Sequence, residues 1–226
     1  QLKTPLAGLR MQAELAQREA DGGDAKAVKR SLHQIARSSQ QAAHMVNQLL
    51  AMARAEDANE ARRVTPFNLS AVATEVVHDF VPRALAKGLD LGYEGPGANE
   101  ASAPRIVGEA VLVRELIRNL VDNAVQYTPG GGTVTVRLLP DPYGQVAVLQ
   151  VEDNGPGIPE GERELVFQPF YRALGTEVDG SGLGLAIVRE IAERHGGTVE
   201  IEAMNPRAVS PGTRITVRLP TATNAS

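Results

Sequence analysis

The sequence predicts an α+β protein in two parts, a helical hairpin followed by a sandwich of helices and strands. Residues 1–56 are almost all helix-forming, and their apolar side chains recur at alternating spacings of four and three around a break at 21–24. From residue 67 onward, β-branched residues and glycine become frequent. Helical and strand patterns then follow one another irregularly, which is typical of an α+β sandwich and not of a regular βαβ sheet.

The two helices of the hairpin carry more apolar surface than they can bury against each other. Leu2, Leu6 and Leu9 belong to the apolar seam before the break, and Val28 and Leu32 belong to the seam after it. Because one pair of helices cannot cover both seams, a second copy would complete a four-helix bundle. We therefore expect a homodimer.

A polar linker precedes the second part. Residues 57–66 lack periodicity and end in Thr-Pro, which favours extended backbone. The second domain is expected over 67–220, with a disordered tail at 221–226. Its first helix is expected at 68–85, with Ser70 as a candidate N-cap. The other helices are expected at 109–127 and 183–195, and the strands at 89–93, 105–107, 133–138, 145–152, 198–202 and 213–219.

The composition excludes several classes of function. The 226 residues carry a formal net charge of −4 and no cysteine, which rules out disulfides, thiolate zinc sites and cysteine nucleophiles. A nucleic-acid partner would need a basic face and is not expected. No run of eighteen apolar residues marks a membrane span. The four histidines lack zinc-binding spacing, and His195, at a helix C-terminus, is expected to be partly cationic because of the helix dipole.

The stretch ELIRNLVDNAVQYTP, residues 115–129, is the first sign of chemistry. On a helix, Asn119 and Asn123 stand one turn apart, so their amide oxygens can point to a common spot. Mg²⁺ prefers oxygen ligands and is often held by a few protein groups together with substrate phosphates. Taken alone, such a pair is more often the decoration of a solvated helix.

Two glycine-rich stretches follow. Asp153 comes just after an apolar strand, where a buried carboxylate could accept a hydrogen bond from the amine of adenine, and Gly155 and Gly157 follow it. The second stretch, GSGLG at 180–184, opens an apolar helix and could hold phosphate. It is not a P-loop, because no Gly-Lys-Ser/Thr follows. Alone, the first stretch is a turn signal and the second is weak.

Together, the motifs resemble a known family. The stretches NLVDNAVQYTP, DNGPGI, FQPFYR and GSGLGLAIV resemble, in order and spacing, the N, G1, F and G2 boxes of bacterial sensor histidine kinases. The opening QLKTPLAGL resembles the H box from the residue after its phospho-accepting histidine. The resemblance implies a dimeric helical hairpin joined to a Bergerat-type ATP-binding domain. It further implies transfer of the ATP γ-phosphoryl to histidine and then to a response-regulator aspartate.

The resemblance also implies roles for individual residues. Asn119 and Asn123 would hold Mg²⁺, and Asp153 would accept the adenine amine. Thr4 would serve dephosphorylation of the regulator. Residues expected around the adenine and the phosphates, or as anchors of the ATP lid, are Tyr127, Gly155, Gly157, Ile158, Phe167, Phe170, Tyr171, Arg172, Gly180, Gly182, Leu183 and Gly184.

Three departures from the family pattern are visible. The resemblance places the phospho-accepting histidine just before Gln1, outside this sequence. Gln1 stands where many members carry an acidic general base, and an amide cannot take a proton. Gln126 stands where members often have a basic residue near the phosphates.

Three functions are therefore weighed. The first is the cytoplasmic kinase core of an inner-membrane sensor, with membrane segments upstream and with phosphatase activity toward the regulator, as the family implies. The second is a dimer that binds nucleotide and docks a regulator without autokinase activity. The third is a gyrase-type ATPase, which is disfavoured because its glutamate would have to stand at Asn119, while Glu115 lies one turn too early.

Overall fold

The computed structural model describes Gln17, Ser31 and residues 64–141, 143–169, 171 and 182–222. The chain divides into two compact units, Gln1–Leu50 and Ala51–Ser226. Of the expected hairpin, only Gln17 and Ser31 fall among the described residues, and both are helical. The rest of the hairpin and most of the linker lie outside them.

The second unit is an α+β sandwich, as the sequence predicts. Its main sheet has the strand order β2-β4-β5-β7-β6, in which β2 pairs parallel with β4 and the other neighbours are antiparallel. These strands are β2 (Asp90–Glu94), β4 (Thr133–Pro140), β5 (Val146–Asp153), β6 (Thr198–Ala203) and β7 (Thr213–Pro220). Two shorter strands, β1 (Thr65–Asn68) and β3 (Arg105–Gly108), pair with each other.

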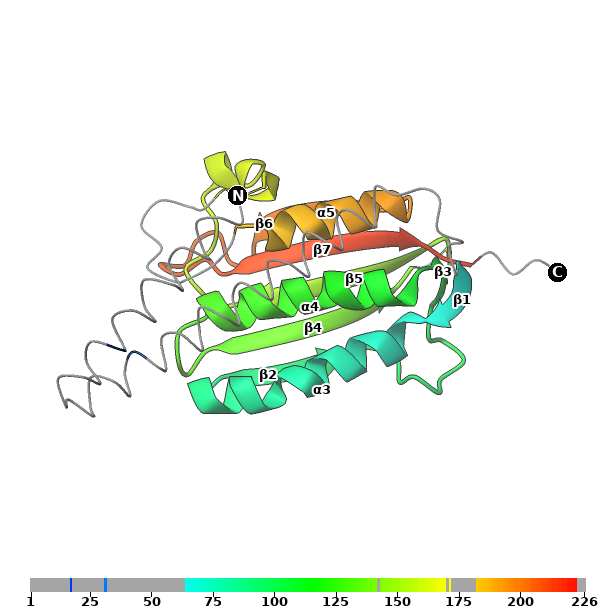
Figure 1. Cartoon of the computed structure of the whole chain (residues 1–226), viewed down its shortest axis with the longest axis horizontal. Helices are drawn as coiled ribbons and strands as arrows, with labels where there is room; N and C mark the ends of the chain where they lie inside the picture. The colour runs from blue at the N-terminus through cyan, green and yellow to red at the C-terminus, as the bar shows by residue number, and fades with distance from the viewer. Residues whose placement is uncertain are drawn as a thin grey trace. The chain divides into compact units, whose positions relative to one another are not determined.

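Three helices lie side by side over one face of this sheet (Figure 1). They are α3 (Leu69–Lys87), α4 (Ala110–Tyr127) and α5 (Gly184–Arg194). Two 3-10 turns, η1 (Glu160–Glu162) and η2 (Leu165–Phe167), precede α5. Within the described ranges, every helix is too short or too polar to cross a membrane.

Alternation along the strands divides the sheet into an apolar face and a polar face. The side chains buried beneath the helices include Val134, Val136, Leu138, Ala147, Leu149, Val151, Ile215, Val217 and Leu219. The residues between them point to the opposite face, as the two-residue period of a strand requires. There, Arg137 and Arg214 both pair with Glu152, whose side chain is only 7% exposed. Arg137 also pairs with Glu94 on β2, and Arg214 also pairs with Glu202 on β6, so these ion pairs connect all five strands.

Helices α3 and α4 run parallel. Arg83 pairs with Asp122, and Lys87 Nζ donates to the carbonyl of Gln126 at 2.7 Å; both contacts join residues 39 positions apart. The pair of Arg114 with Glu75 has the same separation. When contacting residues of two helices keep a constant separation in sequence, the two helices run side by side in the same direction. These contacts join the two helices along most of their length.

Helices α4 and α5 run antiparallel. Arg194, at the end of α5, pairs at 2.6 Å with the carboxylate of Glu109, the residue just before α4. The backbone N–H of Glu109 donates to His195 Nε2 at 3.1 Å, and His195 Nδ1 lies 2.7 Å from the carbonyl of Ile191. These contacts hold the His195 ring between the end of α5 and the start of α4.

The observed bounds of the elements contradict three expectations from the sequence. Asn68, and not Ser70, caps α3, because its side chain accepts from the N–H of Ala71. Strand β1 begins at Thr65, two residues before the expected domain boundary. The expected disordered tail begins with paired residues: Thr221 N–H donates to the carbonyl of Gln145, and Ala222 N–H donates to that of Arg105. Residues 223–226 lie outside the described part.

Candidate functional site

The amide pair of α4 faces the start of α5. Asn119 is buried, and its Nδ2 donates to the carbonyl of Glu115 at 2.8 Å and to the Glu115 carboxylate at 3.3 Å. These bonds orient the amide group. A Cβ placed on Gly184 would lie 3.4 Å from Asn119 Oδ1 and from both amide atoms of Asn123. Both amides therefore point to the spot where α5 begins, and glycine there leaves space beside them.

The start of α5 is suited to negative charge. Gly182 has a left-handed backbone conformation with φ of 69°, and Leu183 is fully buried beside it. Leu183 is the N-cap residue of α5. The N-terminal end of a helix carries a partial positive charge and directs N–H groups outward. An anion at this end of α5 would lie next to the amide pair.

Asp153 provides the second half of the site. It is the last residue of β5, one residue beyond the expected end of this strand at 152, and it shares a sheet face with Val151 beneath the helices. Its Oδ1 accepts from the N–H of Gly155 at 2.9 Å and from the N–H of Thr213 at 3.3 Å. Burial raises the pKa of the Asp153 carboxyl, and the hydrogen bonds from Gly155 and Thr213 oppose the rise.

Close backbone packing shapes the turn after Asp153. A Cβ on Gly155 would lie 2.9 Å from Asp153 Oδ1 and 3.2 Å from the carbonyl oxygen of Tyr127, at the end of α4. Gly157 has a φ of 78°, and a Cβ there would lie 2.7 Å from Cγ of Pro211. The turn therefore packs between α4 and the loop before β7. Glycine is required here for space as well as for conformation.

The structure brings together some of the expected residues and does not describe others. Tyr127, Ile158 and Tyr171 are partly exposed, whereas Phe167 is buried. Gln1, Thr4, Phe170, Arg172 and Gly180 lie outside the described residues.

Two positions in the site were missed by sequence reasoning. They are Thr213, which donates to Asp153, and Glu115, which orients Asn119. The Pro-Gly before the last strand marks a turn near Thr213, but nothing local places it against Asp153.

The residues present fit a divalent ion that arrives with a phosphate-bearing ligand. Among the described residues, no group of three His, Asp or Glu side chains is placed to hold a metal ion. The polar atoms that converge are amide oxygens, which are suitable ligands for Mg²⁺ but leave its charge uncompensated. Phosphate oxygens would supply the missing negative charge.

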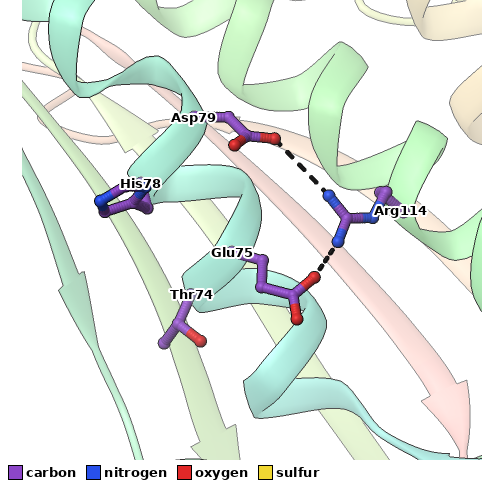
Figure 2. A pocket seen from close by; sticks show the side chains of 5 residues that line it. All are labelled: Thr74, Glu75, His78, Asp79 and Arg114. Carbon is purple, nitrogen blue, oxygen red and sulfur yellow. Dashed lines mark hydrogen bonds and ion pairs between the residues drawn. The ribbon is translucent and has the colours of Figure 1, made fainter.

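A surface hollow of about 450 Å³ lies elsewhere, along α3. Figure 2 shows Glu75 and Asp79 turned toward Arg114 of α4, while Thr74 and His78 extend from another side of α3. This hollow adjoins the α3 flank of α4, whereas the amide pair occupies the α5 flank. It is therefore separate from the candidate site.

Two family models match the sequence. Residues 108–223 match the model of histidine kinase-, DNA gyrase B- and HSP90-like ATPases, and residues 1–58 match the His kinase A (phospho-acceptor) domain. The chain belongs to the sensor histidine kinases. The ATPase match includes α4, β5 and α5, the elements that carry the amide pair, Asp153 and the glycine-rich helix start.

Curated relatives of this histidine kinase are sensor proteins. The sensor protein kinase PmrB of Pseudomonas aeruginosa is 33% identical over 232 residues, covering 97% of this chain and 46% of PmrB. The histidine-protein kinase/phosphatase MprB of Mycobacterium sp. (strain KMS) is 46% identical over 118 residues, covering 51% of this chain and 22% of MprB. The chain thus spans less than half the length of these relatives.

Solved histidine kinase structures share the fold. The mycobacterial sensor histidine kinase MprB superposes with a TM-score of 0.61 at 33% identity, covering 70% of this chain and 97% of that one. Full-length ShkA in complex with AMPPNP superposes with a TM-score of 0.68 at 25% identity, covering 87% of this chain and 40% of ShkA.

Replacement of Gly157 by alanine tests the close packing behind Asp153. Gly157→Ala is expected to lower the free energy of unfolding by about 1–3 kcal/mol, because a side chain is strained at this φ and meets Pro211. Gly161→Ala is the matched control, since a Cβ there meets nothing within 4 Å. Urea unfolding of both variants measures the difference, and equal stabilities would contradict the packing.

Proposed function

We propose that this chain is the core of a sensor histidine kinase that binds Mg-ATP between α4, β5 and α5. The γ-phosphoryl passes to a histidine immediately upstream of Gln1 and then to an aspartate of a response regulator. One observation carries the proposal: the amides of Asn119 and Asn123 converge on the glycine that begins α5. Family membership supports it.

Asp153 recognises the base in this proposal. Its Oδ1 accepts from the backbone N–H groups of Gly155 and Thr213, and a carboxylate has further lone pairs that can accept a hydrogen bond from the exocyclic amine of adenine. The carboxylate lies on the face of the sheet beneath the helices, where water competes little. Tyr127 and Ile158 are the proposed apolar contacts of the adenine ring.

The amide pair and the start of α5 hold the phosphates. Asn119 and Asn123 present oxygen ligands to Mg²⁺, and the ion neutralises phosphate charge when bound. Gly182, Leu183 and Gly184 bring backbone N–H groups and the helix dipole to the same place. Arg172 and Gly180 are further proposed phosphate contacts, by family resemblance.

Catalysis by such a site depends on positioning and charge neutralisation, which provide most of the rate gain in phosphoryl transfer. The amide of Gln1 stands where many relatives carry an acidic base and cannot accept a proton. Water, or another group, takes the proton of the histidine.

Membership of the family supports a proposal for the partner and the location. The proposed active form is a homodimer through the hairpin, facing the cytoplasm as part of a membrane sensor, with a response regulator as its partner. MprB is described as both kinase and phosphatase. For this chain, Thr4 is the residue proposed to act in regulator dephosphorylation.

The kinase is tested by incubating the native reading frame, extended upstream of Gln1, with Mg²⁺ and ATP labelled on the γ-phosphate. Acid-labile, alkali-stable label is expected, and it should disappear when the residue before Gln1 is replaced by alanine. Steady ADP release without label would instead indicate an ATPase. Nucleotide binding with neither product would indicate a regulated docking module.

Asn123→Ala separates the metal assignment from base recognition. Loss of one amide ligand is expected to weaken Mg-ATP binding at least about tenfold, the scale reported for lost support of a metal site. Adenosine, which has no phosphate to bring a metal, should bind as before. Calorimetric titration measures both affinities, and equal weakening of the two ligands would refute the metal assignment.

The buried carboxyl of Asp153 predicts a pH dependence. Because burial raises its pKa above the ordinary 3.8, protonation occurs at a higher pH than for an exposed aspartate. The acceptor is then lost, so ATP affinity should fall as the pH is lowered through this raised pKa. Asp153→Asn removes this titration. Because both proteins bind the same nucleotide, the difference between their pH profiles of ATP affinity excludes the titration of the nucleotide itself. Parallel pH profiles would contradict the assignment.

The same titration affects stability in the opposite direction. A folded carboxyl with a raised pKa binds more protons than its unfolded counterpart. The contribution of Asp153 to the free energy of unfolding therefore increases as the pH falls from above its pKa in the folded protein to below its pKa in the unfolded protein. Reduced nucleotide affinity in this pH window would not be an effect of unfolding at Asp153.

A further inference from the structure

The last turn of α4 lies against the turn that holds Asp153. Tyr127 is the final residue of α4, and its carbonyl oxygen would lie 3.2 Å from a Cβ placed on Gly155. The N–H of Gly155 in turn donates to Asp153 Oδ1 at 2.9 Å. A shift of this helix end would therefore move Tyr127 and disturb the backbone that binds the Asp153 carboxylate.

The carbonyl groups at this helix end need donors from outside the helix, because the last four carbonyls of a helix have no partner within it. The carbonyl of Ala124 accepts from the N–H of Thr128 at 3.0 Å and from its hydroxyl at 2.6 Å. The carbonyl of Val125 cannot be satisfied in the same way, because the residue four positions further on is Pro129, which has no N–H. The last turn of α4 also contains no basic side chain.

Lys87 of α3 supplies both the donors and the positive charge. Its Nζ donates to the carbonyl of Val125 at 2.8 Å and to the carbonyl of Gln126 at 2.7 Å. A cation at the C-terminal end of a helix also interacts favourably with the negative end of the helix dipole. One side chain from the neighbouring helix thus completes the C-terminal cap of α4.

The backbone around Lys87 is fixed to the chain that follows α4. Gly88 is the C-cap of α3, and its carbonyl accepts from the N–H of Gly131 at 3.0 Å. A Cβ on Gly130 would lie only 3.1 Å from the carbonyl oxygen of Lys87. These backbone contacts do not involve the side chain of Lys87. A substitution of Lys87 can therefore remove the cap while the two chain segments stay in contact.

We propose that Lys87 is a positioning residue for the adenine base, acting through the last turn of α4. By holding the carbonyls of Val125 and Gln126, it keeps this turn helical and keeps Tyr127 beside Gly155. The inference rests on the proposed function, because it takes Tyr127 and Asp153 as contacts of the base. It assigns Lys87 to the base and not to the phosphates, so the affinities for adenosine and for Mg-ATP depend on it equally.

The experiment compares Lys87→Met and Lys87→Arg with the unchanged protein. Methionine keeps an unbranched apolar stem without a donor, whereas arginine restores the donors and the charge. Arg83→Met is the matched control, because Arg83 lies one turn earlier on α3 and also pairs with α4, at Asp122, which precedes the last turn of that helix. Calorimetry measures binding of adenosine and of Mg-ATP. Hydrogen exchange measures amide protection over 126–128 and, for comparison, over 116–121.

For Lys87→Met, adenosine affinity should fall about three- to tenfold, as expected when a helix end loses a cation and its hydrogen bonds. Mg-ATP affinity should fall by the same factor, in contrast to Asn123→Ala, which should spare adenosine. Exchange over 126–128 should accelerate, while 116–121 stays protected. Lys87→Arg should recover most of both affinities, and Arg83→Met should leave them within about twofold of those of the unchanged protein.

Three results would overturn the proposal: unchanged adenosine affinity in Lys87→Met, unchanged exchange over 126–128, or an equal loss of adenosine affinity in Arg83→Met. The last result would mean that contact between α3 and α4 in general supports the site, and that the cap has no particular role. Failure of the proposed function is distinguishable, because the unchanged protein would then bind neither adenosine nor Mg-ATP. In that case the role of Lys87 in base binding falls with it, while the exchange data still decide whether Lys87 holds the end of α4.

Discussion

The packing of α4 between two other helices and the sheet is the constraint on which the site depends. One flank of α4 is joined to α3 by contacts at a constant offset, and the other flank is joined to α5, which runs in the opposite direction. Its core side chains, such as Leu116 and Leu120, are fully buried. Rotation of this helix would separate Asn119 and Asn123 from the start of α5. The amide pair is therefore oriented by apolar packing that takes no part in binding.

The strand register imposes a second constraint, at the other end of the site. Asp153 and Glu152 are adjacent carboxylates with opposite surroundings. Asp153 lies beneath the helices among backbone N–H groups, and Glu152 lies on the other face between Arg137 and Arg214. A slip of one residue would exchange them. Arg137 and Arg214 could not then neutralise Glu152, because they would stay on the polar face while Glu152 lay on the face beneath the helices.

Much of this architecture was predictable because its causes are local. The helix with the amide pair was expected at 109–127 and is observed at Ala110–Tyr127, since its apolar spacing reports a buried face. The strand pair around the turn before Gly144 was likewise expected from alternation. The predicted N-cap of α3, Ser70, was wrong because Asn68 and Ser70 are both favourable cap residues, and only the backbone conformation decides which one precedes the helix. The contact between His195 and the N–H of Glu109 could not be predicted, because the two residues lie far apart in the sequence.

The sequence by itself determined which residue types form the site and on which elements they stand. Oxygen-bearing amides one turn apart, a carboxylate at a strand end and glycines at a helix start are local patterns, and their order along the chain identified the family. Only the tertiary structure decided that these patterns meet in one place and that Thr213 and Glu115 orient them. Each of these facts depends on how helices and strands pack, and such contacts have no signature in the residues next to them along the chain.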